Sequence, residues 1–196
     1  MSKSERLRRL CVLVLCGMAC ACAEENQRVP GPLLLPDSEL APTQIVETVA
    51  NLYGDETKST AELEHELREL FVPDDHPSLP PFRHLCAGNK DDGPSWGLEE
   101  EMELACRLFE ARGESVLSFD VELGGLVAME PGQQAPQDWV WVTVDTIVLR
   151  MTTDSADREV VRGSAGFLMA PANGAWRIQR WVDDADGPGL WCAIEE

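Results

Sequence analysis

The stretch VRGSAGFLMAPANGAWRIQRWVDD, residues 161–184, decides the fold. Two segments rich in apolar and aromatic residues flank the turn sequence PANG, which predicts a β-hairpin. In the second segment, alternation places Trp176, Ile178 and Val182 on one side of the strand. The same alternation places Trp181 on the other side, with Arg177, Gln179 and Asp183. We therefore expect Trp176 and Ile178 to pack inward, and the acidic end of the strand to lie at the surface.

Residues upstream of this hairpin extend the sheet. Residues 117–123 alternate apolar and polar side chains, and the pair Gly124-Gly125 predicts a bend or bulge in that strand. Residues 139–151 and 159–170 are rich in β-branched and aromatic residues, and the polar segment TTDSAD between them is a turn sequence. The pattern predicts a four-stranded antiparallel meander.

Three amphipathic helices precede the strands. Their apolar residues recur at helical spacing after a candidate start at Pro42 and Thr43, a capping box of Ser59 and Glu62, and a candidate cap at Ser95. The predicted apolar faces are Ile45, Val46, Val49 and Leu52; Leu63, Leu67, Leu70 and Phe71; and Leu98, Met102, Ala105 and Phe109. We expect an α+β fold in which three helices pack on the concave face of a curved antiparallel sheet of four or more strands.

Three stretches carry a family resemblance. They are ELRELFVPDD (66–75), GLEEEMELACRLFEA (97–111) and the hairpin of residues 161–184. In this order they resemble the cone-shaped superfamily named after nuclear transport factor two, with its cystatin-like fold, which includes ketosteroid isomerase, scytalone dehydratase and SnoaL-like polyketide cyclases. The resemblance implies a curved sheet around a pocket that the helices close. It does not fix a function, because this fold carries many unrelated activities.

The N-terminus has the pattern of an export signal. Basic residues precede an apolar run from Leu10 to about Met18, and small residues and cysteines follow. Residues 1–22 are predicted to be a signal peptide, with Cys22 or Cys20 as the lipidated residue of a bacterial lipoprotein; simple secretion is the alternative. Residues 23–42 then form a Pro-rich tether, residues 43–184 the folded domain and residues 185–196 a tail. The expected location is the periplasm or a membrane surface reached through the lipid anchor, or alternatively the medium.

The remaining cysteines are Cys86, Cys106 and Cys192. An exported compartment permits a disulfide, and three thiols allow one bridge. Cys106 lies beside the apolar stripe of the third helix, where free cysteines are commonly buried. We therefore expect Cys86 to pair with Cys192.

Charge excludes one class of partner. The formal net charge is −19, and it becomes more negative once the basic leader is removed. Such a charge repels nucleic acid and anionic lipid. We expect no nucleic-acid partner and no membrane contact except through a lipid anchor.

Candidate chemistry is sparse. Tyr53, at the end of the first helix, and Asp145, in the middle of a strand, are the acid/base candidates. His76, His84 and Cys86 share one loop, but their spacing does not match the paired ligands of structural zinc. The sequence therefore predicts no metal site and no cofactor.

The tryptophans suggest a binding surface. Alternation places Trp139 and Trp141 with Ile147 on one side of their strand, which makes the outer sheet face more apolar than a water-exposed face usually is. We expect Trp181 and one of the other two in a homodimer or protein-partner contact. The first hypothesis is a non-enzymatic exported module that binds a small apolar ligand in the cone or a partner on the sheet. The alternative is a cone-pocket isomerase, dehydratase or hydrolase acting on a small apolar molecule.

Overall fold

The computed structural model of the chain describes residues 40–86, 95–112, 118–131, 135–153 and 157–183. Six strands form one mixed sheet in the order β2-β1-β6-β5-β4-β3. The strands are β1 (Arg83–Leu85), β2 (Ser95–Trp96), β3 (Ser118–Met129), β4 (Val140–Thr152), β5 (Asp157–Ala172) and β6 (Ala175–Asp183). The predicted meander of β3 to β6 is confirmed, because each consecutive pair is antiparallel.

The β5–β6 hairpin turns where the sequence predicts. Asn173 and Gly174 have φ values of 51° and 79°, a left-handed backbone that glycine and asparagine tolerate best. The strands on either side pair from Ala172 with Ala175 onward. The turn therefore sets the register of the last two strands.

The three predicted helices are present as α2 (Pro42–Gly54), α3 (Thr60–Arg68) and α4 (Leu98–Ala111). The capping box of α3 is confirmed, since the Ser59 hydroxyl accepts from the backbone N–H of Glu62, whose carboxylate accepts from the N–H of Ser59. The predicted cap at Ser95 is wrong. Gly97 occupies the N-cap of α4, and Ser95 belongs to β2 instead.

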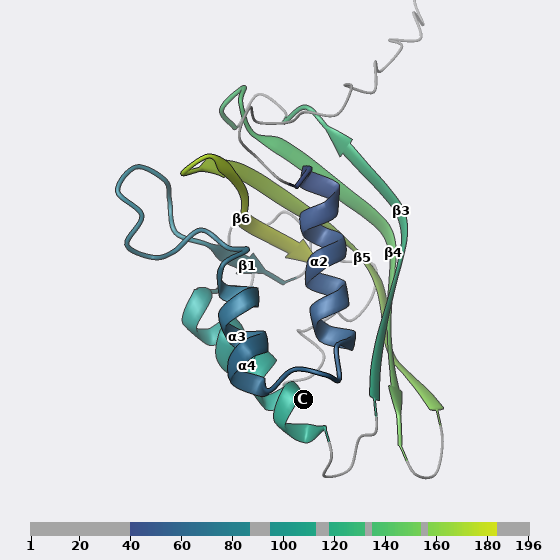
Figure 1. The fold of residues 1–196 in the computed structure, drawn as a ribbon. Coiled ribbons are helices and arrows are strands. Elements are labelled where there is room, and N and C mark those ends of the chain that lie inside the picture. The colour runs from purple at the N-terminus through teal and green to yellow at the C-terminus, as the bar shows by residue number, and fades with distance from the viewer. Residues whose placement is uncertain (1–39, 87–94, 113–117, 132–134, 154–156, 184–196) are drawn as a thin grey trace, which may run out of the picture.

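The sheet differs from the antiparallel prediction at one edge. β1 pairs antiparallel with β2 but parallel with β6, so that His84 lies opposite Trp181. In Figure 1, α2 crosses the sheet, while α3 and α4 lie together beside β1. Apolar residues of all three helices share one core with the inner sheet face, but α2 is the helix that covers the long strands. The prediction that all three helices pack on the concave face is therefore confirmed in part: α2 lies over the long strands, whereas α3 and α4 join the same core beside β1.

The β4–β5 and β5–β6 pairings contain three register shifts, including one between Leu149 and Arg150. The other two reverse the side-chain alternation on which the sequence analysis depends. One lies in β4 between Val144 and Ile147, and it brings Ile147 into the inner core, contrary to prediction. Gly125 of β3, with a φ of 69°, lies against Asp145 at this level. β3 itself pairs with β4 without a register shift, so the bulge predicted at the glycine pair is absent from β3 and lies at the same level in the β4–β5 pairing.

The second shift lies in the β5–β6 pairing. Leu168 pairs with Arg180, but Met169 pairs with Ile178, which leaves Gln179 as the extra residue. Trp176 and Ile178 face the inner core as predicted, and Trp181 joins them there. The prediction that Trp181 faces outward is wrong, because one extra residue exchanges the two sides of a strand.

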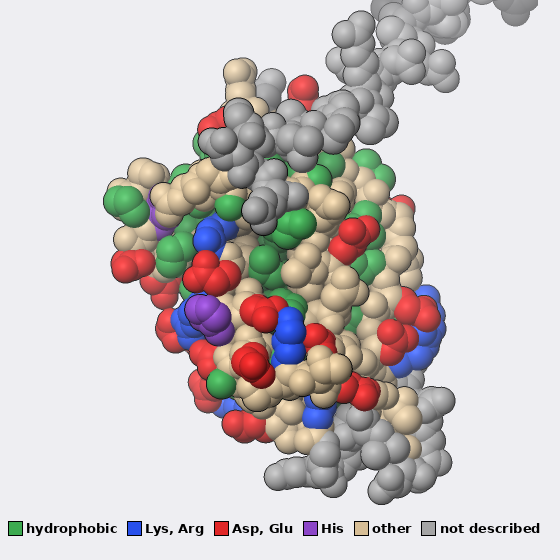
Figure 2. Space-filling view, in the orientation of Figure 1, with side chains coloured by type: hydrophobic (Ala, Val, Ile, Leu, Met, Phe, Trp, Pro, Cys, Tyr) green, Lys and Arg blue, Asp and Glu red, His purple; other side chains and the backbone are tan. Residues whose placement is uncertain are grey.

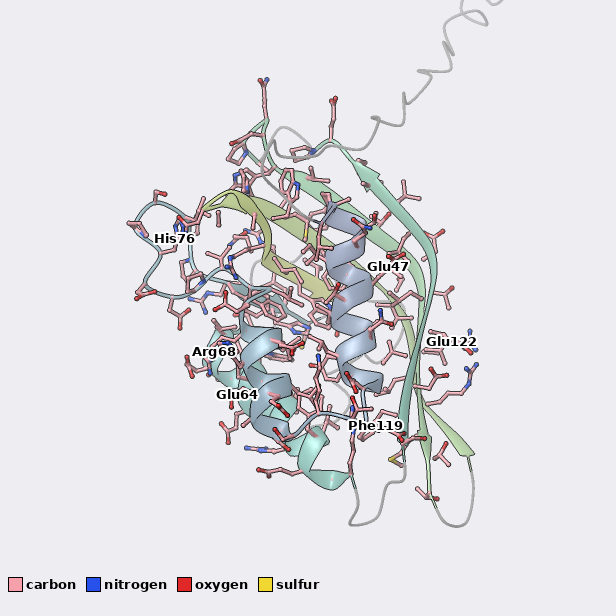
Figure 3. All side chains as sticks on the ribbon, in the orientation of Figure 1. Glu47, Glu64, Arg68, His76, Phe119 and Glu122 are labelled. Carbon is pink, nitrogen blue, oxygen red and sulfur yellow. The ribbon has the colours of Figure 1, made fainter. Side chains whose placement is uncertain are left out.

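The outer sheet face carries its own small cluster. Trp139, Leu168 and Ala170 pack there with Val72, which comes from the segment between α3 and β1; Leu79, Ala135 and Trp141 pack against it. The Trp141 ring lies so close to Gly166 that a Cβ at that position would fall 2.4 Å from it. Further along, Glu122 projects from β3 away from α2 (Figure 3). Part of the predicted outer apolar face is thus covered by the chain itself.

Several predictions fall outside the described residues. They include the signal peptide, lipidation at Cys20 or Cys22, most of the tether, and the tail with Cys192. The Cys86–Cys192 disulfide stays a prediction for that reason. Cys106 is a free cysteine and is half-buried rather than buried.

Candidate functional site: an apolar pocket backed by a buried histidine cluster

An apolar pocket lies between α2 and the sheet. Its wall consists of Val46, Val49, Ala50 and Tyr53 from α2, Val121 and Leu123 from β3, Ile147 and Leu149 from β4, Phe167 from β5 and Trp181 from β6. The enclosed volume is about 20 Å³, which is room for about one water molecule. On the face shown in Figure 2, hydrophobic side chains reach the surface beside α2, with acidic side chains around them. The side chains in Figure 3 fill most of the space between α2 and the strands.

Tyr53 is the one ionisable residue in the wall of this pocket. Its ring packs on Phe109 of α4, with centroids 5.3 Å apart, and the residue is buried. Burial raises the pKa of Tyr53 well above its usual range, and the charge of Glu101 raises it further. Tyr53 is therefore a neutral phenol at physiological pH, able to give or accept a hydrogen bond but not to act as a base.

Behind the pocket lies a buried polar cluster of His84, Glu101 and Asp183, which we call the histidine cluster. Nδ1 of His84 lies 2.8 Å from Oε2 of Glu101, and its Nε2 lies 3.4 Å from Oδ2 of Asp183. The first contact is a hydrogen bond, whereas the second is an ion-pair contact in which Nε2 lacks hydrogen-bond geometry. All three side chains are fully buried and come from β1, α4 and β6. The cluster therefore joins three elements that are distant in sequence.

Two indoles complete the shell of the cluster. Trp96 donates from Nε1 to Oε2 of Glu101 over 2.7 Å, and Trp181 donates from Nε1 to Oδ1 of Asp183 over 2.8 Å. The imidazole of His84 lies between their rings, 4.3 Å from Trp96 and 4.8 Å from Trp181, and is nearly parallel to the latter at 14°. A protonated imidazole gains cation–π attraction from both rings.

Charge in the cluster favours a protonated His84. Burial by itself lowers the pKa of His84, but the charge of Glu101 and the contacts with both carboxylates outweigh it and raise the pKa to about 9. At neutral pH the cluster thus holds an imidazolium between two carboxylates. Oε1 of Glu101 has no hydrogen-bond partner among the described residues.

Trp181 belongs to both sites. One part of its ring lines the apolar pocket, where it also packs on Phe167 with centroids 4.8 Å apart. The same ring stacks on His84 and is tied to Asp183. A movement of this one ring would therefore change the pocket and the histidine cluster together.

The predicted site residues separate into three places. Tyr53 and Trp181 lie in the pocket wall, whereas Asp145 is exposed and lies against Gly125 outside the pocket. Trp139 and Trp141 lie on the outer face, away from both sites. The structure does not bring the two acid/base candidates together.

The histidine cluster was not predicted as a unit. One signal for it is present in the sequence, because Glu101 comes three residues after Leu98 and four before Ala105, on the apolar side of α4. A charged residue on an apolar face needs a buried partner, and His84 is one of three histidines in the chain. Asp183 could not be found in this way, because the shift at Gln179 places it on the inner side.

Two features are absent from the described part of the chain. No group of three or more His, Cys, Asp and Glu residues there has an arrangement that could hold a metal ion. Among the same residues, no helix combines the length and apolar character needed to span a bilayer.

Comparison with solved structures identifies the fold. An NTF2-like protein with a cystatin-like fold from Novosphingobium aromaticivorans aligns over 78% of this chain and 84% of its own, with 11% identity and a TM-score of 0.50. Aln2 from a Streptomyces species aligns over 81% and 95%, with 12% identity and a TM-score of 0.53. A protein from Catenulispora acidiphila aligns over 78% and 91%, with 11% identity and a TM-score of 0.51.

The chain therefore has the α+β cone fold of NTF2-like proteins, as the sequence resemblance implied. At identities this low the likeness concerns the fold alone. No protein-family model and no curated protein sequence matches the chain.

Proposed function

We propose that the protein is a non-enzymatic binding module that takes a small apolar ligand into the pocket beneath α2. The observation that carries this proposal is the chemistry of the wall, which is apolar except for the hydroxyl of Tyr53 and the indole N–H of Trp181. Small-molecule sites are typically apolar concavities with few polar groups. Because the pocket holds about 20 Å³, a ligand larger than one water molecule enters only if wall side chains move.

The enzyme alternative has weaker support. An isomerase, dehydratase or hydrolase needs an ionisable group that reaches its substrate with a suitable pKa. Asp145 lies outside the pocket, and Tyr53 holds its proton too tightly for a base. His84 has a suitable type of side chain, but it is fully buried behind Trp181 and does not line the pocket.

The partner-binding alternative also loses support. The apolar cluster on the outer face is covered in part by Val72 and Leu79 of the same chain. Among described residues, Val127 is the large hydrophobic residue that stays exposed, at 41%. A dimer through Trp139 and Trp141 would have to displace the segment that now packs against them.

Toluene tests the binding proposal, because it is small, neutral and apolar. We expect the wild-type protein to bind it at pH 7 with a Kd on the order of 0.1–1 mM, measured by isothermal titration calorimetry. Val49→Phe places a ring in the pocket and should weaken binding about tenfold or more. The matched control Val127→Phe adds the same ring on the exposed part of β3 and should leave the Kd unchanged.

Two results would contradict the proposal. One is the absence of toluene binding by a folded wild-type protein, and the other is equal binding by both phenylalanine variants. Circular dichroism of each variant shows whether the fold is kept.

We further propose that the module is exported, by cleavage near Cys22 with or without lipidation of Cys22 or Cys20. The support is the basic and apolar leader in the sequence. Mass spectrometry of the mature protein from a bacterial host tests this, because cleavage and a diacylglycerol each change the mass by a distinct amount. An intact Met1 would overturn it.

A further inference from the structure

We propose that His84, Glu101 and Asp183 are positioning residues that hold Trp181 as a fixed wall of the pocket, so that ligand affinity follows the protonation of His84. This inference rests on the proposed function and concerns how the ligand affinity of the same pocket is regulated. It concerns residues that do not touch the ligand.

The contacts of Trp181 link the histidine cluster to the pocket. The Trp181 ring is held from behind by stacking on His84 at 4.8 Å and by its hydrogen bond to Asp183 at 2.8 Å. Its contacts with Phe167 and with the aliphatic wall of the pocket are apolar and non-directional. The orientation of this wall therefore depends on the histidine cluster more than on the pocket.

Loss of the proton changes the forces on Trp181. With His84 protonated, the imidazolium attracts Asp183 at 3.4 Å and the facing indole. With His84 neutral, the buried side chains of Glu101 and Asp183 lose the positive charge that lies between them, and separation or hydration of Asp183 relieves their repulsion. Either response moves the acceptor to which the indole of Trp181 donates.

Besides Glu101 and Asp183, side chains from three elements lie around His84. β2 contributes only the uncharged Trp96. From α2, Tyr53 faces Glu101 and has a pKa raised by burial and then by that carboxylate. From α4, Cys106 also faces Tyr53, and burial followed by Glu64 raises its pKa to about 11. His84 is thus the group of this set that changes charge between pH 7 and pH 10.

Linkage gives the expected sign. If the ligand prefers the pocket whose wall is fixed, it binds more tightly to protein with a protonated His84, and it raises the pKa of His84 in return. Affinity should therefore be highest below the pKa of His84 and fall as the pH rises through it.

The test is the Kd of toluene from pH 6 to pH 10, together with the titration of the His84 ring by NMR with and without toluene. We expect binding to weaken about threefold or more between pH 7 and pH 10, and the His84 midpoint to rise by about half a unit on saturation, as reciprocity requires. Glu101→Gln keeps the side-chain shape and should move both midpoints to lower pH, because the nearest negative charge is lost. The control Glu103→Gln removes an exposed carboxylate of the same helix, paired with Arg107, and should move neither.

Trp181→Phe separates positioning from folding. It keeps an aromatic wall but removes the donor to Asp183, so binding at pH 7 should persist while its pH dependence flattens. Binding of toluene with the same Kd at every pH, or an unchanged His84 midpoint on saturation, would overturn the inference alone. No binding at any pH would overturn the proposed function and this inference together.

Discussion

The two sides of the Trp181 ring have neighbours of opposite chemical character. On the pocket side its neighbours are Phe167 and aliphatic side chains, whose contacts depend on shape and area. On the other side they are His84 and Asp183, whose contacts depend on charge and direction. We therefore expect the apolar side to tolerate substitutions better than the charged side, where loss of a single group leaves buried charge unpaired. This difference predicts where mutations and pH act.

The largest expected effect comes from His84→Leu. The substitution leaves the carboxylates of Glu101 and Asp183 buried without their cation, which costs about 3–5 kcal/mol of unfolding free energy in typical cases. Urea denaturation at pH 7 measures it. The control His76→Leu removes a histidine whose Nδ1 accepts from two backbone N–H groups of a turn, and about 1 kcal/mol or less is expected. Equal losses would show that the charged side has no special sensitivity.

The next effect is the pH dependence of the wild-type protein. The pKa of His84 rises from its ordinary 6.5 to about 9 on folding. The stabilisation from this group is therefore fully present below pH 6.5 and is lost as the pH rises through 9, which amounts to about 3 kcal/mol. Urea midpoints between pH 6 and pH 10 measure it, and Glu101→Gln should reduce the slope. A midpoint that does not change over this range would contradict a protonated His84.

The smallest effect is expected on the apolar side. Phe167→Leu removes part of a buried ring beside the pocket and should cost about 1–2 kcal/mol. Its urea midpoint should keep most of the wild-type pH dependence, because His84 keeps both of its carboxylate partners. Val127→Leu, at an exposed site on β3, serves as the neutral control. Complete loss of the pH dependence in Phe167→Leu would contradict its assignment to the histidine cluster.

Much of the fold follows from local patterns in the sequence. The turn at Asn173-Gly174, the capping box at Ser59 and the two-residue period of β3 depend on neighbouring residues alone, so they could be predicted. β1 and β2 could not, because three-residue and two-residue strands have no period of their own. Their pairing is set by distant partners, above all by β6.

The candidate site was predicted only in part, and single extra residues explain why. Alternation assigns the correct side to Trp176 and Ile178 but fails beyond Gln179, where Trp181 and Asp183 change sides. Gln179 itself is buried, and its Nε2 donates to the carbonyl of Pro81, so a distant segment stabilises the shift. The sequence of β6 alone does not predict this contact. A single sequence therefore shows the pocket residues of α2 but not the histidine cluster.

The parallel pairing of β1 with β6 has a consequence for folding of the chain. β1 is the first strand of the described residues, and its parallel neighbour β6 is the last of them. Closing such a distant contact is entropically costly and slow compared with forming a hairpin. The histidine cluster can therefore be complete only after β6 has joined β1, because Asp183 is the last residue of β6.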